Sequence, residues 1–270
     1  MEQEHKSPLI NTIDYSIRKK ADLIEKNYWA YALRAVFASI YLTIGLAISI
    51  YVCDKLNHIV DGLGKFGYGL MFGWCLVMIV YMNAELGTSN MMYMVNAVHR
   101  KVIPTKTAWK ILATCIFFNF VGAVIATFFM SQTLPFSAGH FEPDTSYLIS
   151  AVTTKLEKTP WTQFVEGIFA NMVVNISVFV SMRMKDDAGK VISTIFIIFI
   201  FAFLGFEHVI ANFSTFSLAF FTNGGPVEGM TVMSVLSNFL FAGLGNFVGG
   251  GLLIGLNYSW LNNRSEKYVD

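Results

Sequence analysis

The stretch F-L-G-F-E-H-V-I-A-N-F, residues 203–213, places a glutamate, a histidine and an asparagine inside a long apolar segment. A polar side chain buried in an apolar environment costs free energy unless it is hydrogen-bonded. A second stretch, A-E-L-G-T-S-N at residues 84–90, interrupts another apolar segment in the same way. Both contain the pattern E-x-x-x-x-N. The matched interruptions predict two helices that are each broken at mid-length.

The composition indicates the environment of the chain. It has 270 residues, of which 54% are hydrophobic and 14% charged, and its net charge is +1. An ordinary soluble domain carries about 25% charged residues. This balance predicts an integral membrane protein and argues against nucleic acid as a partner. The three cysteines lack the spacing of a metal site, so neither a metal nor another cofactor is expected.

A membrane-spanning helix needs roughly 20 mainly apolar residues. Six segments meet this requirement, so the expected fold is an all-α membrane protein with six transmembrane helices. The second and fifth segments contain the two interruptions. The segments cover residues 35–53, 66–98, 111–130, 167–182, 191–221 and 230–256.

An even number of spans places both ends of the chain on the same side of the membrane. Most of the 19 lysine and arginine residues fall on that side. Because cytoplasmic loops are enriched in these residues, both termini are expected in the cytoplasm. The sequence shows no targeting signal, so we expect a multi-pass protein of the bacterial inner membrane. The lysines expected on the other side are Lys55, Lys65, Lys155 and Lys158.

Three parts are expected along the chain. Residues 1–28 mix apolar and basic residues, as is typical of an amphipathic helix on the cytoplasmic membrane surface. Residues 29–262 form the six-helix domain, with repeats at about 29–130 and 160–260. Residues 263–270 form a cytoplasmic tail.

A second motif, N-F-V-G, begins at Asn119 in the third span and at Asn246 in the sixth. Two motifs in the same order indicate duplication of a three-span unit. A unit with an odd number of spans inserts upside down when it is repeated, which predicts an inverted 3+3 repeat. In proteins of this plan, binding sites lie near the midplane at interrupted helices.

The polar residues of the two breaks are expected to have a structural role, with contact to substrate as the alternative. Chain that leaves a helix at membrane depth must find hydrogen-bond partners inside the protein. Glu85 and Glu207 can accept hydrogen bonds from the broken backbone, and Asn90 and Asn212 can tie the broken ends to a neighbouring helix.

The motifs G-F-E-H-V-I-A-N (205–212), A-E-L-G-T-S-N (84–90) and G-N-F-V-G-G-G (245–251) resemble signatures of the formate/nitrite transporter family. The resemblance extends from about Lys20 to Leu261. It implies an aquaporin-like six-helix fold that assembles as a homopentamer with one pore in each protomer.

The resemblance also implies roles for individual residues. His208 matches the pore histidine, and Thr88 matches the threonine that hydrogen-bonds it. Lys155 matches a lysine of the outer vestibule, with Lys158 as the alternative. Further matches are Asn171 of span four, Asn246 of span six, and the constriction residues Phe72, Leu76, Leu86 and Phe201.

One position departs from the family pattern. The residue before the threonine is commonly a bulky aromatic, whereas this chain has Gly87. We expect the inner constriction to be wider or more mobile for this reason, which favours a larger carboxylate.

These roles imply a passive or proton-coupled channel for formate and related small weak acids. Lys155 would attract the anion. The anion would take up a proton, either from His208 or from water polarised by it, and cross the apolar constrictions as the neutral acid. Thr88 would orient the imidazole. Nitrite is the alternative substrate, followed by hydrosulfide, acetate or lactate. The chain has no nucleotide-binding motif G-x-x-x-x-G-K-[ST] that would indicate ATP-driven transport.

Two rival classes are less consistent with these features. A membrane-embedded metalloenzyme or haem protein needs a second histidine or a metal cluster at membrane depth, and the motif H-E-x-x-H is missing from the sequence. We therefore do not expect an enzyme. A purely structural or receptor protein does not need an inverted repeat with matched polar breaks.

Overall fold

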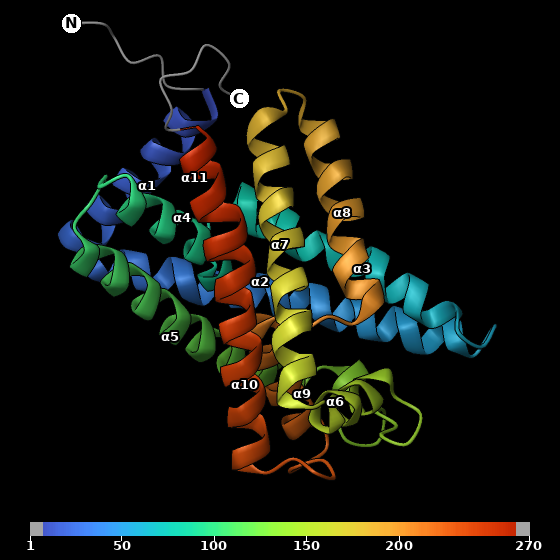
Figure 1. Cartoon of the computed structure of the whole chain (residues 1–270). Coiled ribbons are helices and arrows are strands. Elements are labelled where there is room, and N and C mark those ends of the chain that lie inside the picture. Colours follow the sequence, from blue (N-terminus) through green and yellow to red (C-terminus); the bar gives the residue numbers. More distant parts are fainter. Residues whose placement is uncertain (1–7, 263–270) are drawn as a thin grey trace, which may run out of the picture.

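The computed structural model describes residues 8–262 as a bundle of helices joined by connecting segments, of which the longest lies between residues 131 and 146 (Figure 1). All of its regular elements within these residues are helical, as expected. Their bounds are α1 (Pro8–Lys26), α2 (Tyr28–Asn57), α3 (Leu63–Tyr81), α4 (Gly87–His99), α5 (Thr105–Met130), η1 (Leu134–Phe136), α6 (Tyr147–Glu157), α7 (Pro160–Arg183), α8 (Asp187–Leu204), α9 (Val209–Thr222), α10 (Val232–Asn246), the π-helix η2 (Phe247–Leu256) and α11 (Asn257–Leu261).

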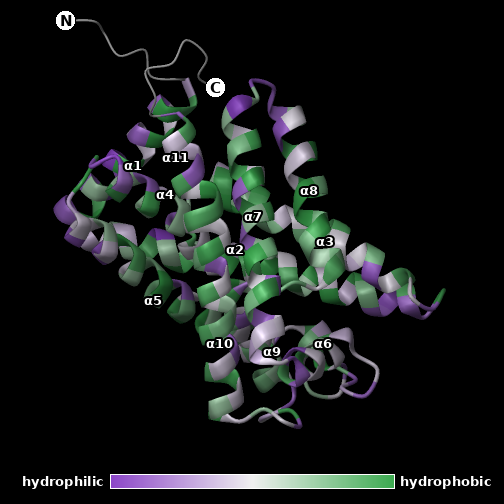
Figure 2. Cartoon of the chain, in the orientation of Figure 1, coloured by the Kyte–Doolittle hydropathy of each residue, from purple (hydrophilic) through white to green (hydrophobic). Residues whose placement is uncertain are grey.

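Six helices in the described part are long and apolar enough to cross a membrane, which confirms the expected six spans. They are α2, α3, α5, α7, α8 and the continuous helix Val232–Leu261, formed by α10, η2 and α11. Apolar residues cover most of these helices, whereas hydrophilic residues gather on α1, the α7–α8 loop and the turn between α2 and α3 (Figure 2).

The second and fifth spans are broken where the sequence predicts. The chain leaves helical geometry between α3 and α4, where Asn83 has a φ of 51°, and between α8 and α9, where Gly205 has a φ of 73°. Glycine, and to a lesser degree asparagine, tolerate this left-handed conformation. Each broken span is thus a full-length helix followed by a half-helix, α4 or α9.

The helix contacts follow an inverted repeat. In the first half α2 packs against α3 and α5, and in the second half α7 packs against α8 and α10. The two halves meet where α3 contacts α8. Each half-helix packs on the last span of the opposite half, with α4 against η2 and α9 against α5. The predicted 3+3 architecture with broken second and fifth helices is confirmed.

The glycines of the two N-F-V-G motifs allow close packing. A Cβ atom at Gly122 would lie 2.4 Å from the carbonyl oxygen of Val36 in α2. A Cβ atom at Gly249 would lie 2.0 Å from the carbonyl oxygen of Ile168 in α7. Any larger residue would therefore force apart the first and third spans of its own half.

The N-terminal helix α1 differs in one respect from the expectation for residues 1–28. It is amphipathic, but its apolar stripe, including Ile13 and Ile17, is buried against α2, α4, α5 and α7 rather than turned toward lipid. Asp14 of α1 also pairs with Arg100 just beyond α4. Residues 1–7 and the expected tail 263–270 lie outside the described residues.

Candidate functional site

The half-helices α4 and α9 begin at one point in the bundle. Thr88, in the first turn of α4, and His208, the N-cap residue of α9, are both buried, and Oγ1 of Thr88 lies 2.8 Å from Nε2 of His208. The N-terminus of a helix carries a partial positive charge. Two such termini therefore face each other across the Thr88–His208 pair, an arrangement that favours negative charge and disfavours cations.

The hydrogen bonds of His208 define its tautomer. The backbone N–H of Ala211 donates to Nδ1 at 3.2 Å, so Nδ1 is an acceptor. The proton of the neutral imidazole therefore lies on Nε2, which donates to Oγ1 of Thr88. A second proton on Nδ1 would break the cap of α9. The geometry thus favours a neutral ring whose N–H is directed at Thr88.

Asn119 and Asn246 clamp the two breaks with the same set of hydrogen bonds. Asn119 Oδ1 accepts from the N–H of Gly87 at 2.8 Å, and its Nδ2 donates to the carbonyl of Glu85 at 2.9 Å. Asn246 Oδ1 accepts from the N–H of Val209 at 2.8 Å, and its Nδ2 donates to the carbonyl of Glu207 at 2.9 Å. Backbone groups released by each break are thus satisfied by the third span of the same half.

Glu207 is the centre of a buried charged cluster near α6. Its Oε1 accepts hydrogen bonds from Lys155 at 3.2 Å and from Lys158 at 2.8 Å. Its Oε2 accepts from Nδ2 of Asn212 at 2.6 Å and from Asn238 at 3.2 Å. With both oxygens occupied by protein donors, Glu207 balances part of the charge of the two lysines and anchors the break.

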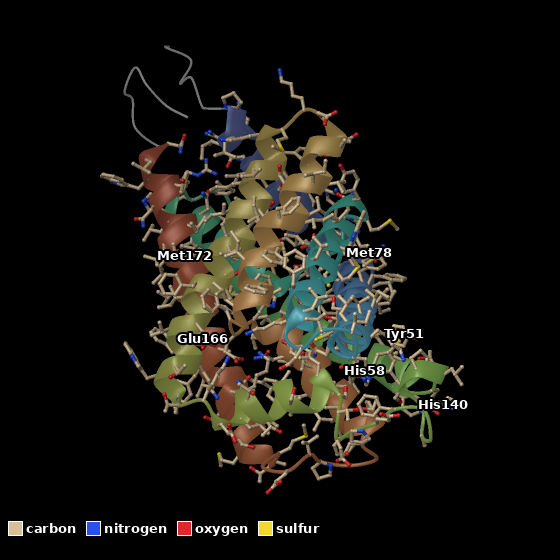
Figure 3. The ribbon with its side chains drawn as sticks, turned by 90° about the vertical axis from the view of Figure 1, so that its right-hand side faces the viewer. Tyr51, His58, Met78, His140, Glu166 and Met172 are labelled. Atoms are coloured by element: carbon tan, nitrogen blue, oxygen red, sulfur yellow. The ribbon has the colours of Figure 1, made fainter. Side chains whose placement is uncertain are left out.

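The two lysines differ in surroundings. Lys158 also binds Glu166, at 2.6 Å, and the carbonyl of Gly205, at 2.9 Å. Figure 3 shows Glu166 near the end of α7 that lies close to α6. Burial alone would lower the pKa of Lys158, but the charge of Glu207 and the hydrogen bond to Glu166 raise it overall. Burial lowers the pKa of Lys155, although Glu207 opposes the shift.

Glu85 has the equivalent arrangement at the other break. Its Oε2 accepts from Lys20 of α1 at 2.6 Å and from Nδ2 of Asn90 at 3.0 Å. Asn90 also donates to the hydroxyl of Tyr31 in α2 at 2.9 Å. Each break therefore combines a glutamate, an asparagine five residues later, and a lysine from outside the two broken spans.

Three cavities follow one another through the bundle, and each shares lining residues with the next. The α6-side cavity, of about 40 Å³, is lined by Lys155, Phe72 and Phe201 among others. The central cavity, of about 20 Å³, contains His208 and shares Phe72 and Phe201 with the first. The α1-side cavity, of about 220 Å³, contains Lys20 and Glu85. Residues common to the central and α1-side cavities are Leu76, Ile79 and Leu86.

The shared residues mark the narrow parts of this pathway. Phe72 and Phe201 pack edge to face, with ring centroids 5.6 Å apart, between the α6-side and central cavities. Leu76 and Leu86 separate the central cavity from the α1-side cavity. The four residues expected at constrictions thus lie on either side of His208.

Two asparagines expected along the substrate pathway lie elsewhere. Neither Asn171 nor Asn246 lines any of these three cavities. Asn171 Nδ2 donates to the carbonyls of Thr88, at 3.1 Å, and Asn246, at 2.7 Å. These side chains join α7, α4 and α10, because their amide N–H groups donate hydrogen bonds to backbone carbonyls.

Gly87 does not have the expected position beside the constriction. A Cβ atom there would point toward Ile116 of α5, at 2.9 Å, and Ile210 of α9, at 3.4 Å. It would meet helix packing rather than the pathway. The expectation of a wider constriction at this residue is therefore not supported by the geometry.

Sequence reasoning missed two contributors to the site. Asn238 of α10 completes the bonding of Glu207, but it lies outside both motifs. Lys20 lies in α1, outside the repeated units, and its pairing with Glu85 could be found only by asking which residue supplies the counterpart of Lys155.

Six spans, two half-helices that meet at a buried histidine and a file of three cavities define a membrane transport protein with a pore through the chain. The protein belongs to the formate/nitrite transporter family. The family model described as "Formate/nitrite transporter" matches residues 8–260, nearly the whole length.

Curated relatives and solved structures agree with this assignment. The "Formate-nitrite transporter" of Plasmodium falciparum is 26% identical over 92% of this chain and 81% of its own. The "Nitrite transporter NirC" of Escherichia coli is 26% identical over 96% of this chain and 94% of its own. A solved "FNT family ion channel" matches the fold with a TM-score of 0.82 at 24% identity, covering 93% of this chain and 98% of that one.

A second solved structure, "Pentameric formate channel with formate bound", matches with a TM-score of 0.70 at 24% identity. It covers 88% of this chain and 98% of the other. At this level of identity the two structural matches establish the fold, whereas the pentameric assembly and the bound formate are properties of that other channel.

Proposed function

We propose that this protein conducts formate and related small monovalent weak acids across the inner membrane of a bacterial cell, passively or coupled to protons. The observation that carries the proposal is the enclosed Thr88–His208 pair between two apolar constrictions. Each end of the pathway beyond these constrictions has a lysine paired with a glutamate. A pathway of this kind attracts an anion at its mouth and offers a neutral passage in the middle.

The first step is attraction of the anion to the α6-side mouth. Lys155 lines this cavity, and positive charge in a narrow cleft raises the local concentration of anions. Lys158 is already held by Glu166, Glu207 and a backbone carbonyl, so Lys155 has the main role. Lys20 performs the same function at the α1-side mouth.

The second step is neutralisation of the anion. Transfer of a bare ion to an apolar medium costs on the order of tens of kcal/mol, whereas a neutral acid pays far less. Low polarity raises the pKa of a carboxylic acid and so favours uptake of a proton as the anion leaves the lysine. The neutral His208, whose Nε2 proton faces Thr88, polarises the site while water supplies the proton. The acid then passes Phe72, Phe201 and the leucines.

Formate is the preferred substrate and nitrite the second choice. The central cavity of about 20 Å³ only slightly exceeds the space of about 10–15 Å³ needed for one water molecule. A cavity of this size favours the smallest weak acids over larger carboxylates. Hydrosulfide therefore ranks above acetate, and lactate ranks last.

The assembly and orientation that we propose are supported by the family and by the charge pattern. The related pentameric formate channel supports a homopentamer with one pore in each protomer. The excess of basic residues on the side of α1 supports cytoplasmic termini. The transporters and channels among its relatives support transport rather than catalysis.

Flux into proteoliposomes tests the proposal. Uptake of formate and nitrite would be compared at about pH 5 and about pH 7 for the wild type and His208→Asn. His140→Asn is the matched control, because His140 is exposed on the periphery of the molecule (Figure 3). We expect formate flux to be faster at the acidic pH. His208→Asn should abolish this flux, whereas His140→Asn should leave it unchanged. Absence of flux for every small weak acid in the wild type would refute the function.

A further inference from the structure

Five aromatic rings form a continuous row from the α6-side mouth to the pore histidine. The ring of Tyr147 in α6 lies 4.7 Å from that of Tyr68 in α3, which stacks on Phe72 at 5.6 Å. Phe72 contacts Phe201 at 5.6 Å, and Phe201 lies 5.8 Å from His208. The row changes from rings with a hydroxyl at the mouth to purely apolar rings at the constriction.

Both tyrosines line the same cavity as Lys155. Within residues 8–262, neither hydroxyl forms a hydrogen bond to another protein group. The hydroxyl of Tyr31, in contrast, accepts a hydrogen bond from Asn90. Both tyrosine side chains are half-buried, so their hydroxyl groups are available to a small molecule in the cavity.

The position of Tyr147 is fixed by hydrogen bonds to α2. Asp54 of α2 accepts hydrogen bonds from the backbone N–H of Tyr147 at 2.7 Å and from the hydroxyl of Ser146 at 3.2 Å. These bonds hold the first turn of α6 against α2. Burial holds the pKa of Tyr147 above its ordinary value, so the phenol keeps its proton and remains a donor.

We propose that Tyr68 and Tyr147 form an oxyanion-binding subsite with Lys155, in which the two phenol groups donate to the oxygens of a carboxylate or nitrite. This inference rests on the proposed function and names specificity residues for the same pathway. The cavity of about 40 Å³ holds a triatomic anion but not a large organic acid.

The subsite distinguishes anions by their number of acceptor atoms. Formate and nitrite each offer two oxygens, one for each phenol, whereas hydrosulfide offers a single, weaker sulfur acceptor. A hydrogen bond to a charged group contributes enough that its loss weakens binding by about tenfold. The phenols therefore stabilise the bound oxyanion beyond the attraction of Lys155, which acts on any anion.

The experiment compares half-saturation concentrations in proteoliposomes for Tyr68→Phe, Tyr147→Phe and the double variant. Tyr51→Phe is the control, because Tyr51 is exposed on the outside of α2 (Figure 3). We expect each single variant to raise the half-saturation concentration for formate about tenfold at a nearly unchanged maximal rate. The value for hydrosulfide should change less than about twofold.

Other outcomes overturn the proposal. An unchanged half-saturation concentration for formate in both single variants contradicts it, and so does an equal rise for formate and hydrosulfide. If one variant fails to fold, the other still tests its own hydroxyl. A wild type that conducts no weak acid refutes the proposed function, whereas conduction that ignores the tyrosines refutes only this subsite.

Discussion

Leu86 and His208 occupy equivalent positions in the two halves of the protein. Each follows the glutamate of its break, each is the N-cap residue of a half-helix, and both line the central cavity. His208 caps α9 with its own Nδ1, whereas Leu86 gives α4 no side-chain cap. The inverted repeat is thus symmetric in backbone but not in chemistry at its centre.

Replacements of His208 should separate its two tasks. Asparagine is a good N-cap but is too short to reach Thr88 in the same way. We expect His208→Asn to lose weak-acid flux and keep its thermal stability. His208→Leu should lose flux and also about 1 kcal/mol of stability through loss of the cap. Flux assays and thermal unfolding of the purified variants measure the two effects. Equal unfolding temperatures for both variants would contradict the capping role.

The asparagine clamps should contribute to stability equally in the two halves. Asn119→Ala or Asn246→Ala leaves buried backbone groups without partners, and each such group costs about 1–3 kcal/mol. We expect both variants to unfold at a markedly lower temperature than the wild type, by similar amounts. Asn257→Ala is the control, because Asn257 is exposed and bonds only within its own helix turn. A large effect in only one half would argue against equivalent clamps.

Lys155 and Lys158 should differ in function. Lys155→Met removes the cation that lines the α6-side cavity, so we expect a raised half-saturation concentration for formate and a weaker dependence on ionic strength. Lys158→Met removes the ion pair with Glu166. We expect it mainly to reduce thermal stability. Uptake kinetics at low and high salt, together with unfolding temperatures, check both statements. If instead Lys158→Met changed the uptake kinetics and Lys155→Met only the stability, Lys158 would be the residue that attracts the anion.

The two lysines also predict a pH effect. Since burial lowers the pKa of Lys155, its charge is lost as the pH rises through that lowered value, while Lys158, with a raised pKa, keeps its charge. The half-saturation concentration for formate should therefore rise at alkaline pH. Lys155→Arg, which remains charged, should suppress this rise. Kinetics measured from neutral to alkaline pH decide the point, and identical profiles for wild type and variant would exclude Lys155 as the titrating group.

Much of the fold could be predicted from polar residues that are rarely found inside membrane-spanning segments. Glu85 and Glu207 in mid-span imply breaks, since a helix at that depth satisfies its own backbone and needs no carboxylate. The repeated N-F-V-G motif then fixes the pairing of the halves. Six spans and two breaks follow, and the structure contains both.

The details of the site depend on the orientation of individual side chains, which cannot be read from sequence motifs. Whether Asn246 faces a pore or a backbone depends on helix rotation, and so does the direction of a side chain at Gly87. Tyr68 and Tyr147 come from different halves of the chain and meet only after folding. Lys20 approaches its glutamate from a helix outside the repeat.

The exchange of half-helices between the halves has an evolutionary consequence. Because α4 packs mainly on η2 and α9 mainly on α5, a single three-span unit would leave much of its half-helix without a packing partner. A half-length ancestor could have closed such a pore only by pairing with a second copy inserted in the opposite direction. That ancestor would have had dual topology, with basic residues balanced between its two faces. The one-sided charge of the present chain would then have arisen after gene fusion, when each half was committed to a single orientation.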